Sequence, residues 1–385
     1  MASLPWSRAL SSIFTGVLLF LAFAEIFVNR IKLVRNFGFY CLIGLVFLCI
    51  LDGFRADSIA QWLAYVNIKL PLMLLSFAIL VFNSKISEQF LKEISIYFCL
   101  AITSTSIASA TNYWLNYSTL NALVLQSKPI PILGEIHHIT FSVFCAFAVF
   151  VSLYYAITNR IKWLWIIAIL NLIGLHILTA RTGLLGFYFA SILLGIVYIK
   201  NNSVKMKWIA LSVLAILILP LVAFFSFNSF HNRVVNSWVD IKTILHKHDA
   251  NYQSLGMRIE ASKTAIDLIK KHLLLGVGCT NLNEAMAIQY ETNHTNLFIE
   301  NRILPHNQFI LETAIHGIGG LLLLLLFFAM PFIYPFKEWP VLFVALWALL
   351  FFASMFECIF DRQHGIILVS VFWFLYFEKR NHLVN

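Results

Sequence analysis

Long runs of apolar residues, separated by short polar segments, make up most of this 385-residue chain. A helix needs about 20 mainly apolar residues to cross the roughly 30 Å hydrocarbon core of a bilayer. About eleven runs approach that length, near residues 10–28, 37–51, 62–82, 93–112, 137–157, 163–179, 182–199, 208–226, 307–334, 340–357 and 364–377. The pattern therefore predicts an all-α fold, a polytopic integral membrane helical bundle with about 11–12 transmembrane helices.

One long hydrophilic stretch, residues 227–303, interrupts this pattern between two late helices. The chain shows no internal repeat that would divide it further. We therefore expect one membrane domain, with N-terminal membrane helices in 1–226, a large loop at 227–303 and C-terminal membrane helices in 304–385.

The middle of this loop has the pattern of a helix. Ser254 is suited to be an N-cap, and the apolar residues that follow recur at helical spacing, which predicts an amphipathic helix near 254–272. Arg258 then falls in the first turn. The free backbone N–H groups and the positive dipole end there favour a bound anion.

Positive charge in the short loops predicts the direction of the bundle, because Lys and Arg are retained on the cytoplasmic side. The loops of one side carry thirteen such residues: Arg30, Lys32, Arg35, Lys85, Lys92, Arg160, Lys162, Lys200, Lys205, Lys207, Lys337, Lys379 and Arg380. The opposite short segments carry five: Arg8, Arg55, Lys128, Arg181 and Arg362. The large loop, the segment 113–136 and the turn around Asp361 should therefore face the periplasm or exterior.

Composition agrees with a membrane protein and argues against binding of nucleic acid. Hydrophobic residues make up 60% of the chain and charged residues only 12%, about half the charged fraction of soluble domains. The net charge of +9 arises mainly in the short loops, and the large loop holds eight Lys and Arg against seven Asp and Glu. No basic surface is left to neutralise a phosphate backbone.

Arg181 and His306 are the polar residues best placed for chemistry. Arg181 stands between two apolar runs, where an arginine is costly unless it reaches water or a partner. An interfacial arginine that snorkels to water is the alternative. His306 lies where the large loop re-enters the membrane, and a neutral histidine there can take a proton from a hydroxyl. A polar anchor is the alternative for His306.

Other polar residues have weaker patterns. Lys69 lies within a membrane run and should face protein or water, where it would add positive charge to a donor site or make a structural hydrogen bond. Glu357, Asp361, Arg362 and His364 form a polar cluster at the last outer turn, which would serve either as an ion-pair staple or in acceptor binding.

Three further features are interpreted as structural. His137 and His138 are adjacent, so on a helix they point in different directions, which favours interfacial anchoring over a metal site with His364. Glu312 and His316 are expected to make packing contacts. The spacing from His306 and Asn307 to Gly317 and Gly320 would let the next helix pack closely.

Three motifs in this order resemble the O-antigen ligase family, part of a superfamily that also contains the Wzy-type O-antigen polymerases. The similarity covers roughly residues 160–375. The motifs are Thr179-Ala180-Arg181-Thr182-Gly183, Ser254-Leu255-Gly256-Met257-Arg258, and Pro305-His306-Asn307 with Gly317 and Gly320.

The resemblance implies a glycosyltransferase of lipopolysaccharide biosynthesis in the bacterial inner membrane, with its active site facing the periplasm. It would transfer an undecaprenyl-diphosphate-linked O-antigen polysaccharide to the lipid A-core oligosaccharide by direct displacement with inversion. Arg181 and Arg258 would clamp the diphosphate, and His306 would orient or deprotonate the attacking hydroxyl. Lys69, Asn307, Glu357 and Arg362 are second-tier candidates.

The implied partners are the lipid-linked glycan donor, the lipid A-core or another glycan acceptor, and membrane lipids. No metal or other cofactor is expected, because a lipid diphosphate is already an activated donor. A Wzy-type polymerase of O-antigen or exopolysaccharide is the main alternative, followed by oligosaccharide transfer to a protein. A non-enzymatic transporter is less favoured, because the charges collect at one interface rather than at the midplane.

Overall fold

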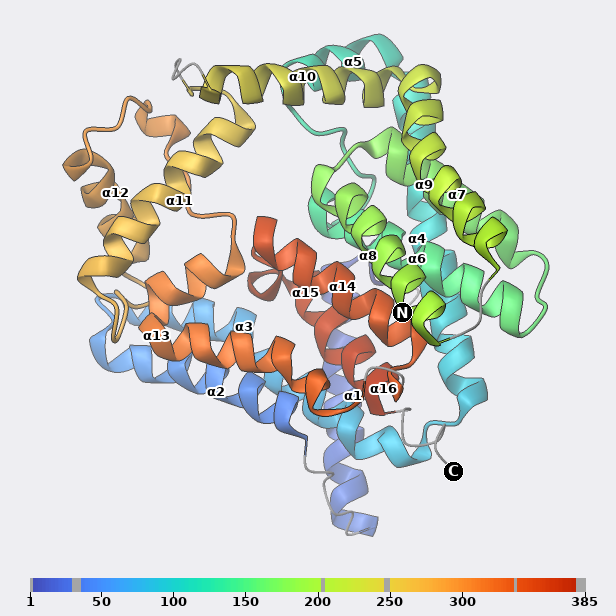
Figure 1. Ribbon diagram of the computed structural model, residues 1–385. Helices are drawn as coiled ribbons and strands as arrows, with labels where there is room; N and C mark the ends of the chain where they lie inside the picture. The colour runs from blue at the N-terminus through green and yellow to red at the C-terminus, as the bar shows by residue number, and fades with distance from the viewer. Residues whose placement is uncertain (1–2, 30–35, 202–204, 246–249, 336–337, 379–385) are drawn as a thin grey trace.

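The computed structural model describes residues 3–29, 36–201, 205–245, 250–335 and 338–378. Every regular element in these ranges is helical (Figure 1). Six of the thirteen positive residues used to predict the direction of the bundle lie outside the described residues: Arg30, Lys32, Arg35, Lys337, Lys379 and Arg380.

Within the described residues, eight helices are long and apolar enough to cross a membrane. They are α1 (Arg8–Asn29), α2 (Phe37–Leu51, continued by a short turn to Arg55), α3 (Ile59–Phe82), α4 (Glu88–Leu115), α6 (His138–Thr158), α8 (Arg181–Asn201), α9 (Met206–Ser226) and α13 (Gln308–Ala329).

Three shorter apolar helices complete the set. They are α7 (Leu164–Leu178), α14 (Val341–Phe356) and a last helix in which α15 (Gln363–Ile367) leads through a π-helical stretch into α16 (Phe374–Glu378). Each of the eleven predicted apolar runs therefore corresponds to a helix. The predicted all-α membrane bundle is confirmed.

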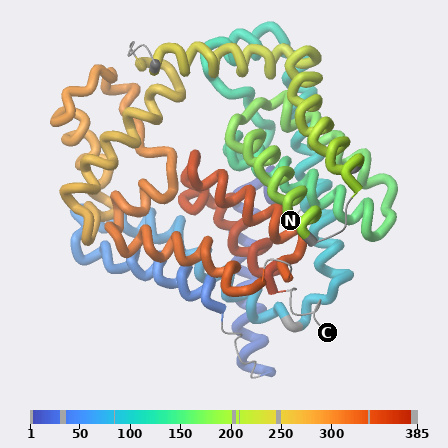
Figure 2. The backbone as a smooth tube through the Cα atoms, in the orientation of Figure 1, coloured from blue at the N-terminus to red at the C-terminus, as the bar shows by residue number. Residues whose placement is uncertain are grey.

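The large loop is itself helical. It contains α10 (Asn228–Leu245), α11 (Ser254–Lys271) and α12 (Leu282–Thr292), which follow one another along the upper and left edges of the molecule in Figures 1 and 2. The predicted helix near 254–272 is present as α11. Ser254 is its first residue rather than its N-cap, because Gln253 takes the cap position, with no side-chain cap hydrogen bond. The sequence analysis did not predict α10, α12 or α5 (Tyr117–Leu125), and α10 packs along α5.

The centre of the bundle is a core of large aromatic side chains. Helix α6 is buried along most of its length and packs against α4, α7, α8 and α14. Phe327 of α13 stacks on Trp373 of the last helix with 4.1 Å between ring centroids. In contrast, α9 is almost entirely exposed and contacts mainly α10 and α8, as expected of a helix that faces lipid.

Gly317 interrupts α13 and admits the backbone of the loop that follows α11. Its φ of 64° and ψ of −154° are not helical, and the carbonyls that this break frees accept hydrogen bonds from the loop. Val277 N donates to Ala314 O and Gly278 N to Ile315 O, both at 2.9 Å. A Cβ at position 317 would lie 2.3 Å from the oxygen of Leu274. The expectation that Gly317 permits close helix packing is therefore wrong, because the space is taken by a loop.

Gly317→Ala should destabilise the protein by about 2–4 kcal/mol, since it combines a left-handed backbone with a steric clash. Gly319→Ala is the matched control, because its Cβ would meet only Leu48 at an ordinary 3.7 Å. The measurement is thermal unfolding of both purified variants in detergent. Equal midpoints for the two variants would contradict this account of the break.

Candidate active site

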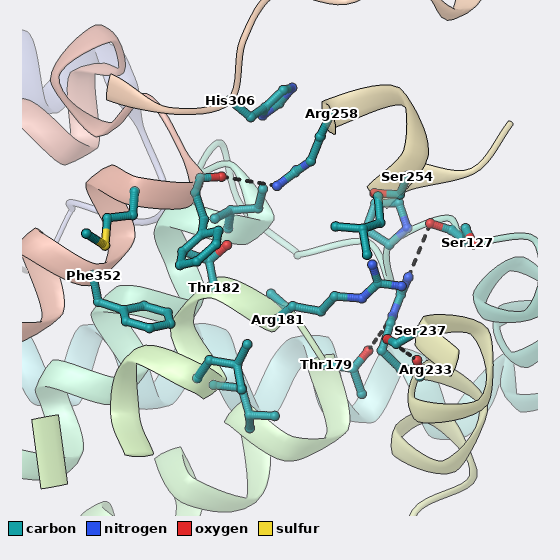
Figure 3. A pocket seen from close by; sticks show the side chains of 18 of the residues that line it. Ser127, Thr179, Arg181, Thr182, Arg233, Ser237, Ser254, Arg258, His306 and Phe352 are labelled. Carbon is teal, nitrogen blue, oxygen red and sulfur yellow. Dashed lines mark hydrogen bonds between the residues drawn. The ribbon is translucent and has the colours of Figure 1, made fainter. Parts of the chain in front are cut away.

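A cavity of about 970 Å³ lies between α8, α10, α11 and the ends of α13 and α14. Four of the predicted site residues line it: Arg181, Arg258, His306 and Asn307. Figure 3 shows Arg258 beside His306, with Arg181 reaching in from α8. Residues more than 100 positions apart in the chain thus meet in one place.

Arg181 is the first residue of α8. Thr179, which precedes it by two positions, ends α7 in the left-handed conformation with φ of 52° and so turns the chain into α8. The Arg181 guanidinium donates from Nη1 and Nη2 to Oδ2 of Asp240 at 3.3 and 3.2 Å. Asp240 belongs to α10 and is buried. Arg181 therefore has an acidic partner and also faces the cavity.

Arg258 lies in the second turn of α11. Its Nη1 donates to the carbonyl of Phe356 at 3.1 Å, and its Nη2 lies 3.8 Å from Oε2 of Glu357. Burial lowers the pKa of Arg258 below its ordinary value, and the Glu357 carboxylate opposes that shift. These contacts direct the guanidinium toward the end of α14.

Glu357, the residue directly after α14, is the centre of this side of the site. It is buried, and its carboxylate accepts hydrogen bonds from His306 Nδ1 and from Arg362 Nη2, each at 3.2 Å. Burial alone would raise the pKa of Glu357, but the bond from His306 and the charges of Arg362 and Arg258 lower it to about 2. Its interactions therefore stabilise the fold above about pH 4.5, and this stabilisation is lost as the pH falls toward 2.

The Glu357 contact fixes which nitrogen of the His306 ring faces the carboxylate. A carboxylate only accepts, so Nδ1 carries a proton and Nε2 of the neutral ring is left as the basic atom. Asn307 has a structural role beside it, because its Oδ1 caps α13 by accepting from Ile310 N and its Nδ2 donates to Met355 O, both at 3.0 Å. The arrangement presents a base held in one orientation.

Lys69 lies outside the cavity. Its side chain is fully buried between Glu312 and Asp361, with Nζ 2.9 Å from Asp361 Oδ1 and paired also with Glu312. Of the two interpretations from sequence, the contacts are those of a structural interaction. Gln308 joins the same cluster by donating to Asp361 Oδ2 at 2.6 Å, which links Lys69 to the segment just after His306.

The expectation of packing contacts for Glu312 and His316 is wrong. His316 Nδ1 lies 2.9 Å from Oε2 of Glu312, and its Nε2 lies 3.3 Å from Oδ2 of Asp52. Both ring nitrogens face carboxylates, so both donate and the ring is an imidazolium. Asp52 also pairs with Arg55, which donates to the carbonyls of Leu275 and Gly276. Lys69, Glu312, His316, Asp52 and Arg55 therefore form one network, buried except for Arg55, that ties the membrane helices to the loop after α11.

The outer histidines do not come together as a metal site. His137 precedes α6, and its ring is tilted by 48° against that of His138, which lines the cavity. His364 lies on α15, and its buried Nε2 has no hydrogen-bond partner among the described residues. The residues that the structure describes hold no group of three or more His, Cys, Asp or Glu side chains arranged around a metal position.

Two charged residues of the site, Arg233 and Asp240, were not predicted from the sequence. Both come from α10, and Arg233 lines the cavity. The signal in the sequence is their spacing of seven, which places both on one face of a helix. This signal has meaning only once residues 228–245 are recognised as a helix.

The fold and the cavity define a multi-pass membrane protein with arginines and a histidine–glutamate pair gathered at one end of the bundle. Residues 166–325 match the family model Wzy_C, described as O-antigen ligase. The predicted resemblance to the O-antigen ligase family is therefore confirmed over residues 166–325. The matched residues include Arg181, Arg258 and His306. No curated protein matches the chain.

Proposed function

We propose that the protein is an O-antigen ligase, which transfers an undecaprenyl-diphosphate-linked polysaccharide to a hydroxyl of the lipid A-core oligosaccharide. The observation that carries the proposal is that Arg181, Arg258 and His306 line one cavity within the family domain. Guanidinium groups suit a diphosphate, because they offer planar, charge-assisted hydrogen bonds.

The shape of the cavity supports a lipid-linked donor. One part is cationic, and the other is lined by apolar side chains that include Leu185 of α8, Ile216 and Pro220 of α9 and Phe352 of α14. Because α9 is almost entirely exposed, this apolar part borders the surface expected to face lipid. A polyprenyl chain would lie there while its diphosphate meets the arginines.

The reaction would be a direct displacement at the anomeric carbon. His306 Nε2 would take the proton of the acceptor hydroxyl as its oxygen forms the new bond to that carbon. The bond from the anomeric carbon to the diphosphate oxygen breaks, and the electron pair leaves on the diphosphate. Arg181 and Arg258 would stabilise that growing negative charge, and Glu357 would hold the histidine and balance its positive charge.

The proposed reaction also predicts where the protein lies and how its parts are arranged. The protein would lie in the bacterial inner membrane with the cavity toward the periplasm, where the lipid-linked donor and the lipid A-core are both expected. Residues 1–226 and 304–385 would form the membrane domain, and 227–303 would cover the cavity from outside. The donor needs no metal for activation, so we expect transfer without one.

A strain that lacks the gene distinguishes the possible activities. An O-antigen ligase predicts long carrier-linked glycan together with bare lipid A-core, and rescue by the wild-type gene but not by the His306→Ala gene. Single repeat units on the core would instead identify a polymerase. An unchanged lipopolysaccharide profile would rule out both and direct attention to a protein acceptor or to transport.

Arg181→Lys should lower glycan transfer by about 10–100-fold, because a point charge cannot reproduce two parallel hydrogen bonds. Lysine keeps the positive charge, so a side chain that only extends to water at the membrane surface would tolerate this substitution. Transfer is measured in membranes with equal amounts of inserted protein. Wild-type transfer by this variant would identify Arg181 as a snorkelling arginine without a role in donor binding.

A further inference from the structure

The cationic part of the cavity contains more positive than negative charge. Asp240 is the acidic partner of Arg181, and Glu357 accepts from Arg362 and lies near Arg258. Three guanidinium groups line the cavity, those of Arg181, Arg233 and Arg258, and a fourth, that of Arg362, pairs with Glu357. The four guanidinium groups meet two carboxylates, those of Asp240 and Glu357. Two positive charges are left unbalanced. A diphosphate esterified at both ends carries one negative charge on each phosphate and would balance them.

Arg233 accounts for much of this excess. Within the described ranges, no carboxylate oxygen lies within 4.0 Å of its guanidinium, whose partners are neutral oxygens. Nη1 donates to Ser127 O at 3.2 Å and Nη2 to Lys128 O at 2.8 Å. Each terminal nitrogen carries a second N–H, so these bonds leave two donors for a ligand.

The position of Arg233 matches such a ligand. Its side chain lines the cavity and lies close to that of Arg181 in Figure 3. Burial, and then the positive charge of Arg181, lower the pKa of Arg233 to about 10. Two neighbouring cations with one carboxylate between them are a cost to the free protein, and an anion placed between them would relieve it.

We infer that Arg233 is a third donor-binding arginine, which together with Arg181 contacts one phosphate of the lipid diphosphate while Arg258 contacts the other. This inference rests on the proposed function, because it assigns a residue to the same donor. One phosphate would then bind beside α10 and the other beside α11. A lipid monophosphate would occupy only one of these two positions.

The experiment compares binding of undecaprenyl diphosphate and undecaprenyl monophosphate to the full-length protein in detergent micelles. Wild-type protein should bind the diphosphate more tightly. In Arg233→Gln, affinity for the diphosphate should fall by about tenfold or more, the loss typical of a charge-assisted contact. Arg302→Gln is the matched control, because Arg302 lies on the same loop outside the cavity and pairs with Glu291.

Asp240→Asn supplies a second measurement that does not disturb the bonds of Arg233 to Ser127 and Lys128. The Asp240 carboxylate competes with a bound phosphate for Arg181 and Arg233. Removal of its charge should therefore raise the affinity for the diphosphate by several-fold or more. If Arg233→Gln does not fold, Asp240→Asn and Arg233→Lys are measured instead. Arg233→Lys keeps the positive charge but lacks the paired N–H donors of the guanidinium.

The possible results test the role of Arg233 and the proposed function separately. Unchanged affinity for the diphosphate in the Arg233 variants would show that Arg233 only holds the segment at Ser127 and Lys128. A fall in diphosphate affinity in Asp240→Asn would likewise overturn the inference. If the wild-type protein bound neither lipid, the proposed function itself would fail.

Discussion

Replacing His306 by alanine should lower glycan transfer by about 10²–10⁴-fold, the usual contribution of a positioned general base. The side chain lines the cavity and is part-exposed, and its Nδ1 contact with Glu357 leaves Nε2 as the ring atom that would accept the proton in the proposed reaction. Its removal should therefore cost little stability. Transfer is measured in membranes from the complemented strain, with the amount of inserted protein determined in the same samples.

Two further variants make this result specific. His272→Ala removes an exposed histidine at the end of α11 in the same loop, and it should transfer glycan normally. Glu357→Gln keeps the shape of the partner but removes its charge, so it should lower transfer by a smaller factor than His306→Ala. Near wild-type transfer in His306→Ala would show that the acceptor hydroxyl loses its proton elsewhere.

The two sides of the site differ in what the sequence revealed. Arg181, Arg258 and His306 could be selected from sequence, because each charged or basic residue lies at the border of an apolar run or in the first turns of a predicted helix. Glu357 could be grouped with Arg362 by proximity in the chain. Its bond to His306 could not be predicted, since it joins residues 51 positions apart through the packing of α13 against α14.

The apolar runs predicted the bundle because a lipid environment imposes one condition on every segment, namely internal satisfaction of its backbone by a helix. Helix α10 of the large loop was not predicted, because an amphipathic helix outside the hydrocarbon lacks the long apolar run that marks a membrane span. The break in α13 at Gly317 was not predicted for a different reason. A glycine in an apolar run fits close helix packing as well as an interruption, and only the loop near Val277 distinguishes the two.

The network around Lys69 is the feature whose disruption should cost most stability. Lys69→Met should destabilise the protein by about 3–5 kcal/mol, because it leaves the buried Glu312 and the part-buried Asp361 with one cation fewer. Methionine fills nearly the same volume, so the loss would be electrostatic rather than one of packing. The measurement is the midpoint of thermal unfolding in detergent, with Lys85→Met as control. Lys85 pairs with Glu25 at the exposed surface, where such a pair contributes little.

Neutralising a partner tests the explanation itself. In the double variant Lys69→Met with Asp361→Asn, the remaining carboxylate Glu312 keeps its contact with the His316 imidazolium, so charge balance is restored and stability should recover in part. A single variant as stable as wild type would mean that the buried carboxylates do not depend on Lys69. A double variant less stable than the single one would mean that Asp361 acts through its hydrogen bonds to Tyr65 and Gln308 rather than through its charge.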